Sequence, residues 1–469
     1  EVAVTETATY FYNERQKVSV NLSKVMELNE KYGIGANGEV VNVSFGLYAA
    51  EELISASGTT IPADGLIEIL MVDENGKAVV SSDLPLGKYY VKEIATDSHY
   101  LLNDAKYPFE FAYAGQTVEL VEITANDGKD IENDLIYGSV SGKKVDENGE
   151  ALGGALIGIF KADETEFTKD NAIETTVSAD DGSFSFENVP YGVWVVKEIE
   201  APTGYVLDGT PYQVTVNEDE QVIEITVTDE FVRGNISLTK VDKDFPDNKL
   251  SGAVFEVYKD LNGDGKLDDG DELLGELEEA DKGIYEMKEL LYGKYLVKET
   301  KAPEGFVLDE GVYSVFIEEN GKTYQVENEA GVGFINDAMR GSLKIVKTSS
   351  DGKVEGFSFR VTGENGYDKT FVTDAKGEIL IENLRIGEYT ISEVSDKASA
   401  NYVLPANKDA TVKVGSTTVV TMHNELRDTP KTGDNSHLGL WFTLAGLSAL
   451  GIAATTFVAL KKKKKEDAE

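Results

Sequence analysis

The sequence of 469 residues contains no cysteine and only three histidines. Without cysteine the chain can form no disulfide and offers no thiolate as a nucleophile or metal ligand. His99, His423 and His437 are too far apart in the sequence to indicate a zinc site or the base of a catalytic nucleophile. Any covalent reinforcement of the fold must therefore use other side chains.

Positive charge is also scarce. The chain has 44 lysines and arginines against 85 aspartates and glutamates, and its formal net charge is −41. Nucleic-acid binding needs a basic surface that neutralises phosphates, so the composition argues against nucleic acid as a partner. We interpret the acidity as a means of keeping an extracellular surface soluble, in preference to a site for a specific cationic ligand.

Helical periodicity is almost absent before the C-terminal tail. Short segments of alternating apolar residues, such as Ser183 to Phe186, are separated by turns rich in Asp, Asn and Gly. Such segments are typical of β-strands, and the length of the chain indicates several domains. The sequence therefore predicts an all-β protein made of tandem Ig-like sandwiches.

The strand that contains Tyr295, Val297 and Glu299 places a carboxyl group on a buried face. Alternate side chains of a strand share one face, and the two apolar residues mark this face as the inner one. A buried carboxyl is costly or takes up a proton unless a partner compensates it. The same pattern recurs around Glu93, Glu198 and Glu393.

Each of these glutamates has two polar companions at matching places in the sequence. A strand before it carries an inward lysine, and a strand after it carries an inward Asn or Asp. The lysines are Lys24, Lys144, Lys240 and Lys347. The amides and the acid are Asn133, Asp229, Asn336 and Asn424. Each Asn or Asp precedes the next lysine by 11 residues (144 − 133, 240 − 229 and 347 − 336), which indicates tandem copies of one domain.

The repeat predicts domain one at 17–137, domain two at 138–233, domain three at 234–340 and domain four at 341–427. Residues 1–16 resemble the closing strand of a further copy, because Asn13 again precedes Lys24 by 11 residues. The first residue is Glu1 and no secretory apolar segment follows it. We therefore expect the chain to be the C-terminal part of a longer exported protein.

Residues 428–469 combine three features in a fixed order. These are the motif Thr429, Pro430, Lys431, Thr432 and Gly433, the uncharged apolar run 438–460, and five lysines at 461–465. The run is long enough for a transmembrane helix, and the lysines would stay in the cytoplasm. Together the features resemble the cell-wall sorting signal of Gram-positive surface proteins. The resemblance implies that a sortase cleaves between Thr432 and Gly433 and joins the Thr432 carbonyl to peptidoglycan. Since the family motif begins with Leu, Thr429 leaves the class of sortase open. The alternative to sorting is that the segment is a simple membrane anchor.

Residues 295–306, Y-L-V-K-E-T-K-A-P-E-G-F, and 195–205, V-V-K-E-I-E-A-P-T-G-Y, resemble the E-box of Cna B-type, SpaA-like pilin domains. Domains one and four keep only the glutamate strand. The resemblance implies prealbumin-like sandwiches in which the lysine of the first strand and the asparagine of the last join in a spontaneous isopeptide bond assisted by the glutamate. The implied sets are Lys24, Glu93 and Asn133; Lys144, Glu198 and Asp229; Lys240, Glu299 and Asn336; and Lys347, Glu393 and Asn424.

The residue types suit this chemistry. Burial favours the neutral amine, which can attack an amide carbon, and it favours a protonated glutamate, which can donate to the amide oxygen. Asp229 would release water instead of ammonia, and a buried ion pair with Lys144 is the alternative there. Four uncrosslinked polar networks are the wider alternative. Each domain would react once on itself, so we expect no enzyme.

Residues 260–272, D-L-N-G-D-G-K-L-D-D-G-D-E, have the oxygen spacing of an EF-hand-like calcium loop. The predicted ligands are Asp260, Asn262, Asp264, the backbone carbonyl of Lys266, Asp268 and Asp271. The twelfth position is Asp271 with Glu272 one step late, and no helices flank the loop, so a solvated acidic hairpin is the alternative. No other cofactor is expected.

These features predict a structural stalk or adhesin on the surface of a Gram-positive bacterium, anchored covalently to peptidoglycan. The expected partners are a sortase, peptidoglycan and, through an upstream part, a host glycan or matrix protein; the membrane is a partner only before sorting. A pilin subunit is one alternative, although Tyr107 to Phe109 lacks the lysine of the Y-P-K-N type motif that polymerising pilins carry. The stalk of a surface enzyme with an upstream catalytic domain is the other.

Overall fold

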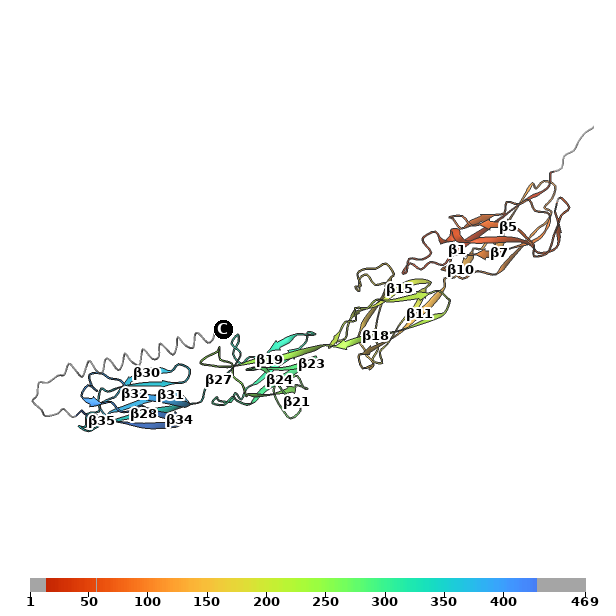
Figure 1. Cartoon of the computed structure of the whole chain (residues 1–469). Helices are drawn as coiled ribbons and strands as arrows, with labels where there is room; N and C mark the ends of the chain where they lie inside the picture. Colours follow the sequence, from red (N-terminus) through yellow and green to blue (C-terminus); the bar gives the residue numbers. More distant parts are fainter. Residues whose placement is uncertain (1–13, 56, 428–469) are drawn as a thin grey trace, which may run out of the picture. The chain divides into compact units, whose positions relative to one another are not determined.

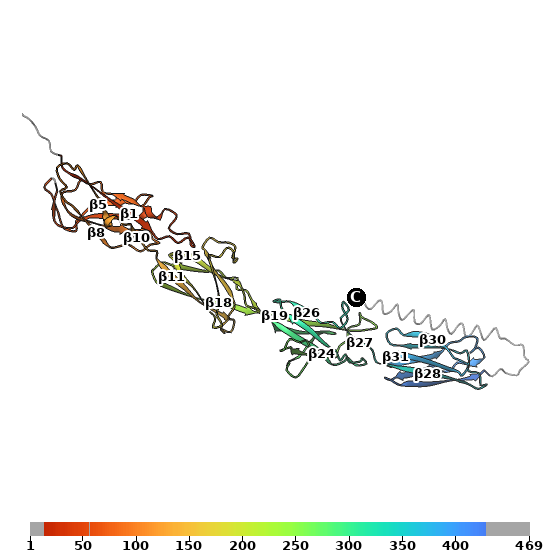
Figure 2. The same cartoon turned by 180° about the vertical axis from the view of Figure 1, so that it is seen from behind.

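The structure is a computed structural model that describes residues 14–55 and 57–427. These residues form four all-β domains, which follow the chain from the red-orange to the blue end of the colour bar (Figures 1 and 2). The prediction of tandem β-sandwiches is confirmed. Within the described residues no helix is long and apolar enough to cross a membrane. The predicted membrane helix at 438–460, the sorting motif at 429–433 and Asn13 lie outside them.

The elements of each domain follow the order of the chain. Domain one contains β1 (Lys17–Met26), η1 (Glu39–Asn42), β2 (Ser44–Ala49), β3 (Leu53–Ile54), β4 (Thr60–Ile61), β5 (Leu66–Met71), β6 (Lys77–Val79), β7 (Gly87–Ala95), β8 (Lys106–Phe111), β9 (Leu120–Thr124), η2 (Ala125–Gly128) and β10 (Ile131–Asn133). Domain two contains β11 (Tyr137–Asp146), β12 (Leu156–Lys161), β13 (Glu174–Val177), β14 (Ser183–Pro190), β15 (Gly192–Glu200), β16 (Tyr205–Val206), β17 (Tyr212–Val216) and β18 (Gln221–Phe231).

The other two domains repeat this arrangement. Domain three contains β19 (Arg233–Asp242), β20 (Val254–Lys259), β21 (Glu272–Glu276), β22 (Glu278–Asp281), β23 (Ile284–Leu291), β24 (Gly293–Lys301), β25 (Val312–Ile317), β26 (Thr323–Gln325) and β27 (Phe334–Asn336). Domain four contains β28 (Arg340–Ser349), β29 (Ser358–Gly363), β30 (Asp368–Val372), β31 (Glu378–Arg385), β32 (Gly387–Glu393), β33 (Tyr402–Val403), β34 (Lys408–Val412) and β35 (Thr417–Leu426).

Two main sheets make up each domain, and the first and last strands are neighbours in one of them. In domain two the sheets have the strand orders β14-β11-β18-β16 and β13-β12-β15-β17, and in domain four β31-β28-β35-β33 and β30-β29-β32-β34. The pairs β11 with β18 and β28 with β35 are parallel, as are β1 with β10 and β19 with β26. The glutamate strands β7, β15, β24 and β32 belong to the other sheet.

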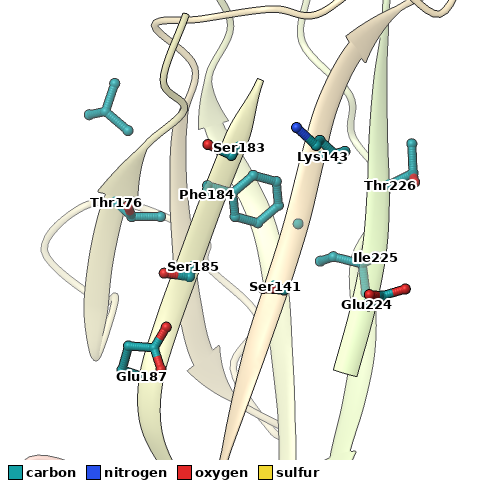
Figure 3. A pocket seen from close by; sticks show the side chains of 12 residues that line it. Ser141, Lys143, Thr176, Ser183, Phe184, Ser185, Glu187, Glu224, Ile225 and Thr226 are labelled. Atoms are coloured by element: carbon teal, nitrogen blue, oxygen red, sulfur yellow. The ribbon is translucent and has the colours of Figure 1, made fainter. Parts of the chain in front are cut away.

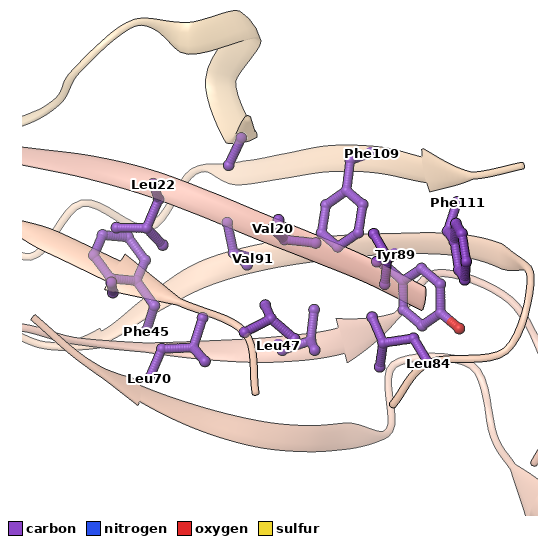
Figure 4. Packing of buried hydrophobic residues seen from close by; sticks show 14 of the residues in the cluster. Val20, Leu22, Phe45, Leu47, Leu70, Leu84, Tyr89, Val91, Phe109 and Phe111 are labelled. Atoms are coloured by element: carbon purple, nitrogen blue, oxygen red, sulfur yellow. The ribbon is translucent and has the colours of Figure 1, made fainter. Parts of the chain in front are cut away.

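The core of each domain fills the space between its two sheets. In β1 every second residue from Val18 to Lys24 is buried, as the alternating sequence predicts. Figure 4 shows Leu22 of this strand with Phe45 of β2 and Val91 of β7, all in one cluster of buried side chains. Because Lys24 continues this inward row, its amine is placed in the same apolar interior.

Gly142 lies between Val140 and Lys144 on the inner face of β11, and the ring of Phe184 covers it. A Cβ atom at this position would lie 1.9 Å from the ring, far inside contact distance. Gly142→Ala is therefore expected to displace the ring and to destabilise domain two by about 1–3 kcal/mol. Urea denaturation with hydrogen exchange in β11 and β14 measures the effect. Gly209→Ala is the control, because no atom lies within 4 Å of its Cβ position, and equal stability of both variants would contradict the prediction.

Candidate functional site

The register of the strands brings the predicted side chains of domain two together. Lys144 of β11 lies opposite Val227 of β18, so Asp229 follows two residues later on the same face. Glu198 extends from β15 in the facing sheet, and its carboxyl oxygen Oε1 lies 3.3 Å from the Lys144 amine. The same offset of two residues separates Asn133 and Asn424 from Ile131 and Met422, the register partners of Lys24 and Lys347.

All twelve predicted side chains are buried. The four lysines are 0–2% exposed, the four glutamates 0–9%, and the asparagines and the aspartate 0–3%. Side chains of these types are almost never fully buried unless they are paired. The polar groups must therefore compensate one another inside each domain.

In domain one the glutamate lies between the amine and the amide. Lys24 Nζ is 3.9 Å from Glu93 Oε2 and donates to the carbonyl of Ile131 at 3.0 Å. Asn133 Nδ2 donates to Glu93 Oε1 at 2.7 Å and to Thr96 Oγ1 at 2.8 Å. Burial lowers the pKa of Lys24 to about 8 against the opposing effect of Glu93, and burial raises the pKa of Glu93. Both shifts favour the uncharged forms of the two groups.

Domain four has a similar arrangement with a looser contact to the amine. Asn424 Nδ2 donates to Glu393 Oε1 at 2.6 Å. Lys347 Nζ donates to the carbonyl of Thr348 at 2.6 Å and lies 4.2 Å from the ring centre of Phe357. Burial lowers the pKa of Lys347 and raises the pKa of Glu393.

Domain two holds its three groups as a charged cluster. Lys144 and Asp229 form a direct, fully buried ion pair. Burial, together with a hydrogen bond to Asp229, raises the pKa of Glu198 to about 7. The arrangement therefore supplies an amine paired with a carboxyl oxygen of Asp229 and an acid, Glu198, that is protonated over part of the neutral range.

In domain three Lys240 Nζ lies 3.8 Å from Glu299 Oε1 and donates to the carbonyl of Phe334 at 3.0 Å. Asn336 is the last residue of β27, and its side chain is buried. The amine and the glutamate thus occupy the same interior position as in domain one.

The sequence reasoning missed a backbone donor that binds three of the glutamates. Asn103 N donates to Glu93 Oε1 at 3.1 Å. Asp208 N donates to Glu198 Oε2 at 2.9 Å, and Asp309 N donates to Glu299 Oε2 at 2.8 Å. The donor always lies ten residues after the glutamate (103 − 93, 208 − 198 and 309 − 299), and this constant spacing was a signal in the sequence.

The predicted calcium loop is closed by its own hydrogen bonds. Asp260 accepts from the backbone of Gly263 at 2.6 Å and of Gly265 at 2.8 Å, and Lys294 Nζ lies 3.5 Å from its Oδ2. Asx-type bonds also engage the predicted ligands Asn262, Asp264, Asp268 and Asp271. Among the described residues no group of three or more His, Asp or Glu side chains is arranged to hold a metal ion. Calcium binding stays a prediction that requires the loop to rearrange.

A hollow of about 620 Å³ lies on domain two (Figure 3). Its lining includes Ser141 and Lys143 of β11, Ser185 of β14 and Glu224 of β18. None of Lys144, Glu198 and Asp229 lines it, so the hollow is separate from the buried cluster. Phe184 and Ile225 also line it, so its surface mixes polar and apolar side chains.

Comparisons with known proteins agree with this architecture. A family model described as SpaA, prealbumin-like fold domain, matches residues 29–128, 138–231, 234–330 and 341–426. A second one, described as LPXTG cell wall anchor motif, matches residues 430–467. No curated protein matches the sequence.

Several solved structures are similar to this chain. The Bacillus anthracis TIE protein is 22% identical with a TM-score of 0.50, over 82% of this chain and 69% of that protein. BcpA, the major pilin subunit of Bacillus cereus, is 16% identical with a TM-score of 0.30, over 62% of this chain and 99% of the pilin. The streptococcal ancillary pilin is 20% identical with a TM-score of 0.23, over 69% and 99%. At 22% identity the likeness to the TIE protein concerns the fold alone.

Proposed function

This chain belongs to the SpaA family of prealbumin-like domains, and from this premise we propose that each of its four domains is closed by an isopeptide bond and that the chain serves as a load-bearing stalk. It is a pilin-like, secreted surface protein, and its cell-wall anchor motif implies attachment to peptidoglycan by a sortase. The observation that carries the proposal is the convergence, in one closed interior, of a lysine amine, a glutamate and an amide or acid from three strands.

The proposed reaction needs no group from outside the domain. In domain one the neutral Lys24 Nζ attacks Cγ of Asn133, and protonated Glu93 donates its proton to the amide oxygen. The carboxylate then carries the amine proton to Nδ2, and the Cγ–Nδ2 bond breaks. Ammonia leaves as the carbonyl re-forms and the hydroxyl proton returns to Glu93. One Nζ–Cγ bond replaces one Cγ–Nδ2 bond, and Glu93 ends in its starting state. In domain two the leaving group from Asp229 is water.

The orientation of the amide suits the second half of this sequence. Asn133 Nδ2 faces Glu93 Oε1, so the carboxyl group is in place to protonate the departing nitrogen. A half-turn of the amide group brings Oδ1 to the same oxygen, where a protonated Glu93 can polarise the carbonyl. One glutamate can therefore serve both proton transfers, provided that burial keeps it protonated, as the raised pKa favours.

The bond would carry tension across the domain. Because β11 and β18 are parallel neighbours, a pull on both ends of domain two loads the first and last strands in shear. A bond between Lys144 and Asp229 transfers this load directly and leaves the 85-residue segment between them outside the load path. By analogy with a disulfide that closes a loop of this length, the bond would stabilise the domain by about 4–5 kcal/mol.

The intact mass of the purified chain tests the proposal. We expect a loss of three ammonia molecules, one for each Asn domain, and one water molecule for domain two. Glu393→Gln should cancel the loss of one ammonia from domain four, because a neutral amide cannot relay protons as a carboxyl group does. Tandem mass spectra that join the peptides of Lys347 and Asn424 locate the bond. A mass equal to that of the unmodified sequence would refute the proposed bonds.

We also propose that the loop at 260–272 takes up Ca²⁺ by exchanging its internal hydrogen bonds for metal contacts. Asp260 offers a buried carboxylate, and carboxylate oxygens are preferred ligands of this ion. Calorimetric titration should detect binding in the wild type and a loss of affinity in Asp264→Ala. Asp281→Ala, in the same domain but outside the loop, is the control. No heat of binding at millimolar Ca²⁺ would end this proposal.

A further inference from the structure

The backbone donor ten residues after Glu93, Glu198 and Glu299 is held in place by its own side chain. Asp208 Oδ2 accepts from Tyr212 Oη at 2.7 Å, and its Oδ1 accepts from Thr210 N at 2.9 Å. Asp309 repeats both contacts with Tyr313 at 2.8 Å and Gly311 N at 2.8 Å. The side chains thus fix a turn whose N–H points at the glutamate.

Domain one reaches the same result with a different side chain. Asn103 Oδ1 accepts from Ala105 N at 3.1 Å, and its Nδ2 donates to the carbonyl of Glu132 at 2.9 Å. Glu132 precedes Asn133 on β10. The turn is therefore tied to the strand that carries the reacting amide, and its N–H reaches the carboxyl group of Glu93.

Domain four provides a natural contrast. The segment from Tyr402 to Pro405, Y-V-L-P, corresponds to the segment 205–208, Y-V-L-D, so Pro405 occupies the place of Asp208. Proline has no N–H to donate. Glu393 Oε1 accepts from Asn424 Nδ2 at 2.6 Å, and this residue is 9% exposed, whereas the other three glutamates are 0–1% exposed.

We propose that Asn103, Asp208 and Asp309 are positioning residues whose backbone N–H fixes the carboxyl group of the assisting glutamate for isopeptide formation. This inference rests on the proposed function. In domain two the N–H holds Oε2, so the other oxygen, Oε1, faces Lys144 at 3.3 Å. A carboxyl group held in one orientation spends a larger fraction of time aligned for proton transfer. Domain four, which has Pro405 instead, forms its bond more slowly.

The test replaces one backbone N–H group of the full chain by an oxygen atom. Cell-free synthesis places either alanine or its α-hydroxy analogue, lactic acid, at position 103, so that the two proteins differ only in N–H against O at the backbone. The crosslinked peptide that joins Lys24 and Asn133 is quantified by mass spectrometry over time and at several pH values. We expect the ester at position 103 to react about tenfold more slowly than Asn103→Ala, which keeps the N–H.

The pH profile separates positioning from a general loss of structure. The N–H lowers the pKa of Glu93 against the larger effect of burial, so the ester should move the alkaline limit of the reaction to higher pH. Equal rates and profiles for the ester and Asn103→Ala would overturn the inference while leaving the proposed function intact. A wild-type chain without the crosslink would overturn both.

Domain four supplies a second measurement that does not depend on the folding of the ester. Pro405→Ala restores an N–H at the corresponding position, and we expect it to speed formation of the Lys347 to Asn424 bond. Ala406→Gly is a matched control in the same loop, since it changes a side chain without adding a donor. If Pro405→Ala reacts no faster than the wild type, the inference is wrong.

Discussion

Pulled from its two ends in a single-molecule experiment, the chain is expected to extend far less than four unfolding domains would allow. In domain one, 109 residues separate the two ends of the proposed bond (133 − 24). An extended residue spans about 3.3–3.6 Å, so the bond withholds about 360–390 Å of chain from the pulling force. Asn133→Ala removes the reacting amide and should add one unfolding step of about this length.

A second variant distinguishes the bond from the packing of the amide. Glu93→Gln leaves Lys24 and Asn133 in place but removes the group that assists their reaction. It should therefore show the same added step as Asn133→Ala. If domain one of the wild type extended by its full length in the force–extension traces, no covalent bond could join Lys24 to Asn133. This conclusion would not depend on the stability of the fold.

The positions of the buried groups could be predicted because alternation along a strand needs no knowledge of the third dimension. Glu299 follows Tyr295 and Val297 at intervals of two, and the structure buries all three on one face. The family resemblance implied that the first and last strands meet, but their parallel register, which brings Lys144 and Asp229 together, comes from the structure. Sequence spacing alone predicts which face of its strand each residue lies on. It does not predict which residue of another strand lies beside it.

The backbone donors could not be predicted by the same reasoning. The direction of the N–H at Asp208 depends on a turn that Tyr212 and Thr210 close, and alternation says nothing about such turns. The calcium loop shows the converse problem. The spacing that suits metal ligands also suits Asx turns, and Asp260 uses its oxygens to bind the backbone of Gly263 and Gly265.

Lys144→Ala is expected to unfold domain two near neutral pH. It removes the proposed crosslink, worth about 4–5 kcal/mol, and leaves Asp229 and Glu198 buried without their cation. Breaking a buried ion pair costs about 3–5 kcal/mol, and a whole domain is stabilised by only about 5–15 kcal/mol. Hydrogen exchange of the full chain should show lost protection in β11 and β18, with the other domains unchanged.

Acid should partly restore domain two in this variant. Burial raises the pKa of Glu198 to about 7 even beside Lys144, above its ordinary value of 4.5. Because the pKa of Glu198 is higher in the folded domain than in the unfolded chain, protonation of Glu198 stabilises the folded domain. This stabilisation is complete below about pH 4.5 and is lost as the pH rises through the pKa of the folded domain. Asp229→Asn is the control, because it gives domain two the lysine, glutamate and asparagine of the other domains. This variant should stay folded and release ammonia instead of water. If Lys144→Ala retained wild-type protection in β11 and β18 at pH 8, neither a crosslink nor a required ion pair could exist there.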